Sequence, residues 1–141
     1  MATFNKFDVF AENVAEKVHD LGGDALTYAL TNVAPVVTNT ILANLTQISY
    51  TNLSSRVPTR TSSAQSPAGT YKLVLADLQL LASGGSVGPF RYVVLYNDTP
   101  TGPLPVDPLI GWWDYGSSIT LADGETFTVD ADPTNGVLTI A

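Results

Sequence analysis

The chain has 141 residues, of which 13% are charged, and a formal net charge of −7, with no cysteine and one histidine. The lack of cysteine excludes disulfides and thiolate chemistry, and a single histidine excludes a multi-histidine metal site within one chain. The apolar runs are far shorter than the ~20 residues that span a bilayer, and no basic segment precedes an apolar run at the N-terminus. We therefore expect neither a membrane partner nor a secretory signal.

The few charges are unevenly placed. All six lysines and arginines lie in residues 1–91, where six acidic residues balance them, whereas residues 92–141 hold the other seven acidic residues and no base. Phosphate contacts need Lys and Arg, so we expect no nucleic-acid partner. A surface so poor in charge suits a molecule that neighbours cover, which favours a subunit of an assembly.

Residues 4–21 are predicted to form an amphipathic helix. Phe4, Phe7, Phe10 and Val14 recur at spacings of three and four, which is typical of one apolar helix stripe. The Gly22-Gly23 pair can end the helix. The stripe could pack on the chain's own sheet or on a partner subunit.

After Gly23 the pattern becomes that of β structure. Residues 25–31 are a predicted strand, and residues 46–51 are a second, shorter one. Residues 52–69 are rich in Ser, Thr and Pro, with Arg56 and Arg60 as the only charges, and are predicted to be an extended arm or a long loop.

Residues 70–141 are predicted to form a β-rich body. Within it, residues 70–82 are long enough to bend, residues 89–96 form a central strand, and residues 109–115 form another strand that a turn at 116–118 ends. Residues 119–121 and 126–130 flank an Asp-Gly pair and resemble a hairpin, and residues 137–140 form the last strand. Strands about ten residues apart indicate a β-sandwich or barrel. We expect one domain, residues 1–141, that is mainly β with one N-terminal amphipathic α-helix.

No motif for catalysis is present. The sequence contains no GxxxxGK[ST], HExxH or GxSxG pattern, so we expect no enzyme, no catalytic residue and no cofactor. His19 is expected to be a solvated side chain at the end of the helix. Asp123, Glu125, Asp130 and Asp132 could offer oxygens to a hard cation, but their spacing is not that of an EF-hand, and we predict no metal site.

Trp112 and Trp113 are adjacent in a predicted strand and must therefore point to opposite faces. One of them is expected in the core. The other could lie at a subunit contact, where aromatic residues are enriched, in a second core layer, or in a patch on which a carbohydrate stacks.

Residues 4–22, 29–53, 69–98 and 109–141 resemble small virion structural proteins of tailed bacteriophages. They include FNKFDVFAENVAEKVHDLG, TNTILANLTQISYTNL, GTYKLVLADLQLLASGGSVGPFRYVVLYND and LIGWWDYGSSITLADGETFTVD. The resemblance implies a β-rich, non-enzymatic virion subunit, made in the host cytoplasm, and carries over no active-site residue.

Within that class, the low charge and the predicted arm favour a capsid decoration (cement) protein on the surface of the icosahedral head. Its partners would be the major capsid protein and further copies of itself, as a trimer or a dimer. Arg56 and Arg60 would bind carboxylates of the capsid. The alternatives are a tail, neck or fibre-base subunit and a carbohydrate-binding module. The residues expected at an interface are Phe4, Phe7, Phe10, Val14, Arg56, Arg60, Trp112 and Trp113.

Overall fold

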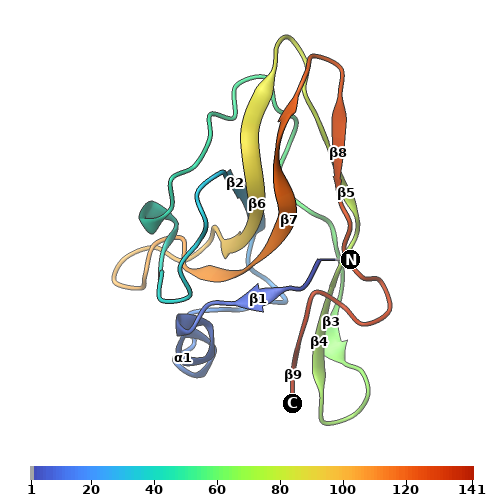
Figure 1. The fold of residues 1–141 in the computed structure, drawn as a ribbon. Helices are drawn as coiled ribbons and strands as arrows, with labels where there is room; N and C mark the ends of the chain where they lie inside the picture. Colours follow the sequence, from blue (N-terminus) through green and yellow to red (C-terminus); the bar gives the residue numbers. More distant parts are fainter. Residues whose placement is uncertain (1) are drawn as a thin grey trace.

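The computed structural model describes residues 2–141. These residues form mainly antiparallel β structure with one short α-helix (Figure 1). In chain order the elements are β1 (Asn5–Lys6), α1 (Val9–Ala15), β2 (Leu26–Thr31), the 3-10 helix η1 (Leu42–Asn44), β3 (Arg60–Gln65), β4 (Tyr71–Leu75), β5 (Leu78–Leu81), β6 (Val87–Asn97), β7 (Leu109–Leu121), β8 (Thr126–Val129) and β9 (Leu138–Ile140).

The strands form three sheets, ordered β1-β7-β6-β2, β3-β4-β9 and β5-β8. The longest ladder joins β6 to β7, from the pair Tyr96 and Leu109 to the pair Val87 and Leu121. Beyond the pair Val87 and Leu121 both strands turn. The segments on the far side of these turns pair again as β5 and β8, where Leu81 lies opposite Thr126. The β5-β8 ribbon therefore continues the β6-β7 ribbon after a fold at the top of Figure 1.

Two groups of buried side chains hold the sheets together. The larger group draws on all three sheets, with Tyr28, Leu73, Leu80 and Val93 among its members. The smaller group, which includes Phe7, lies on the other face of the four-stranded sheet. Strand β2 is buried at all six positions because its alternate residues serve the two groups, as Tyr28 and Ala29 do.

The central position predicted for residues 89–96 is confirmed, because β6 lies between β7 and β2. The predicted strand over 25–31 is confirmed as β2, and the expected bend in 70–82 separates β4 from β5. Residues 46–51 are not a strand. They contact the edge of β2 through a single bridge between Thr31 and Gln47 and a hydrogen bond from Ile48 N to the carbonyl of Leu30 (3.0 Å).

The predicted helix over 4–21 is wrong at both ends, since α1 covers only Val9–Ala15. Residues Asn5 and Lys6 instead pair with the edge of β7. Lys17 adopts a φ of 63°, which takes the chain out of helical geometry six residues before Gly23. Of the three phenylalanines of the predicted stripe, only Phe10 lies in the helix, whereas Phe4 and Phe7 flank β1.

The expected loop over 52–69 contains a strand, because residues 60–65 form β3 on the edge of β4. The hairpin predicted from 119–121 and 126–130 is also wrong. The turn at 122–125 exists, but the strand after it, β8, pairs with β5. Two hydrogen bonds join the turn to Ala82, whose N–H donates to Glu125 O and whose carbonyl accepts from Gly124 N. The turn expected at 116–118 is absorbed into β7, where Gly116 has a φ of 99°.

No helix among residues 2–141 is long and apolar enough to cross a bilayer.

Candidate functional site

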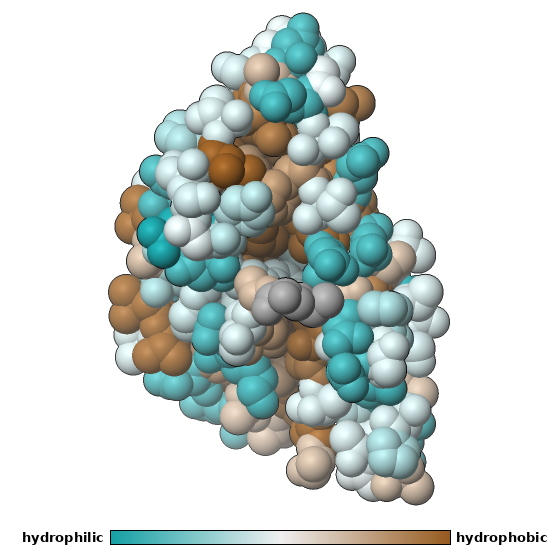
Figure 2. All heavy atoms as spheres, turned by 45° about the vertical axis from the view of Figure 1, so that its right-hand side comes forward, coloured by the Kyte–Doolittle hydropathy of each residue, from teal (hydrophilic) through white to brown (hydrophobic). Residues whose placement is uncertain are grey.

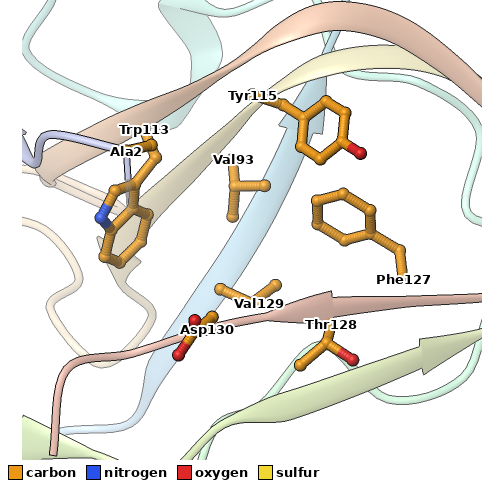
Figure 3. Close-up of a pocket in the computed structure, with 8 residues that line it drawn as sticks. All are labelled: Ala2, Val93, Trp113, Tyr115, Phe127, Thr128, Val129 and Asp130. Carbon is orange, nitrogen blue, oxygen red and sulfur yellow. The ribbon is translucent and has the colours of Figure 1, made fainter.

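A cavity of about 190 Å³ opens between β7 and β8 (Figure 3). It exists because β1 pairs with β7 only at Gly111 and Trp112, while β8 pairs only with β5 among the described strands. The rest of the β7 edge opposite β6 and the outer edge of β8 are therefore not paired with any strand of residues 2–141. We call this cavity the aromatic groove, and it is lined by Ala2, Val93, Trp113, Tyr115, Phe127, Thr128, Val129 and Asp130.

Three aromatic rings form its walls. Figure 3 shows the indole of Trp113 on one side and the rings of Tyr115 and Phe127 on the other, with Val93 and Val129 between them. The centroids of the Tyr115 and Phe127 rings lie 5.2 Å apart, and Tyr115 is 53% exposed. Figure 2 shows hydrophobic atoms recessed between polar surface atoms on this side of the molecule.

Packing against the core holds two of these rings, Trp113 and Phe127, in place. The Trp113 ring lies 4.8 Å from the ring of Phe4 and 5.9 Å from that of Tyr28, which is fully buried. The Phe127 ring lies edge-on to the buried ring of Phe90 at 5.2 Å. Rings fixed in this way lose little conformational entropy when a ligand binds.

One carboxylate lies in the lining. Asp130 follows the last residue of β8, and no lysine, arginine or histidine of residues 2–141 forms an ion pair with it. The lining holds no basic residue, since β7, β8 and Asp130 all belong to the half of the chain without lysine or arginine. The groove thus combines apolar aromatic walls with one negative charge.

A second feature is an exposed apolar surface on two adjoining loops. Val33 and Val36 (each 56% exposed), Val37, Leu104 and Val106 are five of the eight exposed large hydrophobic side chains among the described residues. We call these five residues the valine patch.

Backbone contacts hold the two loops of the valine patch side by side. The N–H of Leu42 donates to Asp107 O (2.9 Å) and the N–H of Leu109 donates to Thr40 O (3.0 Å), with a bridge between Ile41 and Pro108. In Figure 1 the loops that precede η1 and β7 lie next to each other. The patch is therefore built from two segments about seventy residues apart, which backbone contacts join at 40–42 and 107–109.

The residues predicted on the helix stripe pack against their own chain. Phe7 is 2% exposed, with its ring 4.5 Å from that of Trp112, and Phe10 is 4% exposed in the larger group. Phe4 and Val14 are partly buried against the same group. A change of Phe7 to Asp would therefore bury a charge and unfold the chain.

Arg56 and Arg60 bind the backbone of their own chain. Arg56 Nη1 donates to the carbonyl of Tyr28 (2.5 Å), and its guanidinium lies 3.6 Å above the ring of Tyr50. Arg60 Nη2 donates to the carbonyl of Asp24. These contacts tie residues 56–60 to β2 and to the turn before it, so this part of the predicted arm lies on the body.

The prediction that Trp112 and Trp113 face opposite ways is confirmed. Trp112 packs on the smaller group beside Phe7, and Trp113 packs on the larger group at the aromatic groove. Sequence reasoning missed Phe127 as a wall of the groove, whereas Tyr115 belongs with the two tryptophans to one aromatic set of the sequence. Tyr115 carries a signal, since it lies two residues from Trp113 and so on the same face of the strand.

His19 is not a solvated helix-end residue. It lies beyond α1, with its ring 5.4 Å from that of Phe10, and the amide Nδ2 of the buried Asn97 donates to its Nδ1 (3.1 Å). Burial lowers the pKa of His19 to about 4, although the charge of Asp24 acts in the opposite direction.

The four clustered acidic residues do not gather into a metal site. Asp123 accepts from Gly84 N (2.9 Å), Glu125 accepts from Ala122 N (2.7 Å), and Asp132 accepts from Asn135 and from Thr134 N. These hydrogen bonds hold the pKa of Asp132 below its ordinary value. The described residues contain no group of three or more metal-ligating side chains.

No protein-family model, curated protein or solved structure matches this chain.

Proposed function

We propose that the protein is a bacteriophage virion structural protein, a capsid decoration (cement) protein that binds the outside of the icosahedral head. The observation that carries the proposal is the valine patch, because five of the eight exposed large apolar side chains of the described residues lie on two adjoining loops, and gathered apolar exposure marks an interaction surface. The low charged fraction of 13% agrees with a surface that neighbours cover. The patch is the surface that meets the major capsid protein.

The fold suits this role as a β-sandwich, with the β1-β7-β6-β2 sheet as one layer and the other two sheets as the second. The larger group of buried residues draws on both layers, and the three sheets are antiparallel throughout. The four-stranded sheet carries both loops of the valine patch, since one loop follows β2 and the other precedes β7. An interface that exists only in the assembled shell stabilises that shell by mass action.

A binding experiment with two variants tests the valine patch. Purified protein is added to heads that lack it, and occupancy is measured by sedimentation. The double change Val36→Ser and Val106→Ser is expected to lower the affinity about tenfold or more, because each removes buried apolar area from the interface. Leu81→Ser is the matched control, since Leu81 is 40% exposed but lies on β5, outside the patch.

Circular dichroism should show that all three proteins fold alike, since the altered side chains are exposed. Equal decoration by the patch variant and the control would contradict the proposed docking surface. Deletion of the gene should leave heads that assemble but break at lower temperature. Heat-stable heads without a tail would instead assign the protein to the tail, neck or fibre base.

A further inference from the structure

We propose that the aromatic groove binds an arginine side chain of a partner protein. The walls would stack on the guanidinium plane, and Asp130 would accept its N–H groups. This inference deepens the proposed function by giving the chemistry of a second contact, and it concerns a surface separate from the valine patch.

The first argument is charge complementarity. The groove lining contains the carboxylate of Asp130 and no base, and Asp130 has no ion-pair partner within residues 2–141. A cation is the ligand charge that such a lining favours. The aromatic walls favour the same charge, since the faces of Trp and Tyr rings attract cations.

The second argument is the shape of the site. Trp113 stands opposite Tyr115 and Phe127, and the floor of Val93 and Val129 is apolar (Figure 3). An ammonium ion is compact and strongly hydrated, whereas a guanidinium is planar, weakly hydrated and able to stack on rings. The apolar floor also suits the methylene stem of arginine. The site therefore fits arginine better than lysine.

The third argument is that the chain uses the same arrangement internally. Arg91 forms a fork with Asp114, from Nε to Oδ1 (2.7 Å) and from Nη2 to Oδ2 (2.9 Å), while its guanidinium lies 5.4 Å from the ring centroid of Tyr92. Arg56 stacks on Tyr50. The aromatic groove offers the ring and carboxylate parts of this arrangement, and the partner would supply the arginine.

The test measures binding of a small probe to the free protein. The probe is arginine blocked as N-acetyl and N-methylamide, and its neutral isostere, blocked citrulline, is the comparison. The two indole N–H resonances report the site in a nitrogen-edited NMR spectrum, and a Trp113→Phe variant assigns them. Blocked arginine is expected to shift the Trp113 resonance saturably, whereas Trp112, on the other face of the sheet, serves as an internal control.

Two variants separate the charge from the walls. Asp130→Asn should weaken arginine binding about tenfold, to the level of citrulline, because the negative charge that pairs with the guanidinium is lost while one acceptor oxygen remains. Phe127→Leu keeps an apolar side chain but removes the aromatic ring, and it should weaken both probes. Glu12→Gln removes one negative charge from α1, away from the groove, and should change nothing. Thermal melting checks that each variant folds.

Three results would overturn the inference. These are equal binding of arginine and citrulline, a Trp113 shift with methyl glucoside but not with arginine, and no shift with any probe. The first would leave an apolar slot, and the second would make the groove a carbohydrate site. None of them affects decoration through the valine patch, so the failure of this inference and the failure of the proposed function are separate results.

Discussion

Asn97 organises a buried polar contact that joins two segments of the chain, residues 19–24 and 97–99. Its amide Nδ2 donates to His19 Nδ1 (3.1 Å) and to Asp24 Oδ2 (2.5 Å), and its Oδ1 accepts from Thr99 N (3.1 Å). Because His19 Nδ1 accepts a hydrogen bond, the proton of the neutral ring lies on Nε2. Protonation of Nδ1 would break the contact with Asn97, so the fold holds His19 in its neutral form.

The free energy of unfolding should therefore fall as the pH falls from 6.5 towards 4. In this range the unfolded chain protonates His19, whose ordinary pKa is 6.5, while the folded chain does not, since its pKa is about 4. Above pH 6.5 this contribution is fully present. Urea unfolding of the wild type and of His19→Gln at several pH values measures it. The difference between the two proteins should change between pH 4 and 6.5 and be constant above, and parallel curves would rule out this role for His19.

Among the elements, β1 depends on a glycine in its neighbour. A Cβ added to Gly111 would lie 2.6 Å from the backbone oxygen of Asn5 and would also meet the ring of Phe4. Gly111→Ala should therefore push β1 off β7 and destabilise the fold by about 1–3 kcal/mol.

Hydrogen exchange measures the position of β1. The amide of Phe7, which donates to Ile110 O (3.1 Å), should lose protection in Gly111→Ala, and amides of β2 should not. Gly102→Ala is the matched control, because no atom lies within 4 Å of a Cβ at that position. Unchanged protection of Phe7 would show that β1 tolerates the added methyl group.

The elements that could be predicted from the sequence are those with a strong local pattern. β2 and β6 are apolar runs between turn residues, and both were located correctly. β3 was missed because it lies on an exposed edge of β4, where its burial pattern shows no apolar side to recognise. β1 was missed because its partner, Trp112, lies 107 residues away.

In the candidate site, too, local features could be predicted from the sequence and long-range contacts could not. Sequence reasoning placed Trp113 on a face opposite Trp112, since alternation in a strand is a local property. It did not bring Phe127 to Tyr115, because that contact requires β8 to leave β7 and pair with β5. Local patterns therefore identify single walls of the groove, whereas long-range pairing assembles them.

For the whole molecule, we expect self-association. Only 13% of the residues are charged, and the valine patch exposes apolar side chains. The sheets also have edge strands without a second partner among the described residues. Association of subunits would cover these surfaces. Identical subunits usually close with cyclic symmetry, and a trimer suits the local threefold positions of a capsid, with a dimer as the second expectation. Sedimentation at micromolar concentration measures the mass. A monomer of 14.9 kDa that also fails to associate on heads would contradict this prediction.

The pairing of β1 with β7 also determines when the N-terminal segment can fold during synthesis. Asn5 meets Trp112, and Phe7 packs against the same tryptophan, so neither contact exists until the ribosome has added more than a hundred further residues. At elongation rates of about 5–20 residues per second this takes roughly 5 to 20 s. During that time Phe4 and Phe7 lack the strand that covers them. Of the strands of residues 2–141, β1 therefore waits longest for its partner during synthesis.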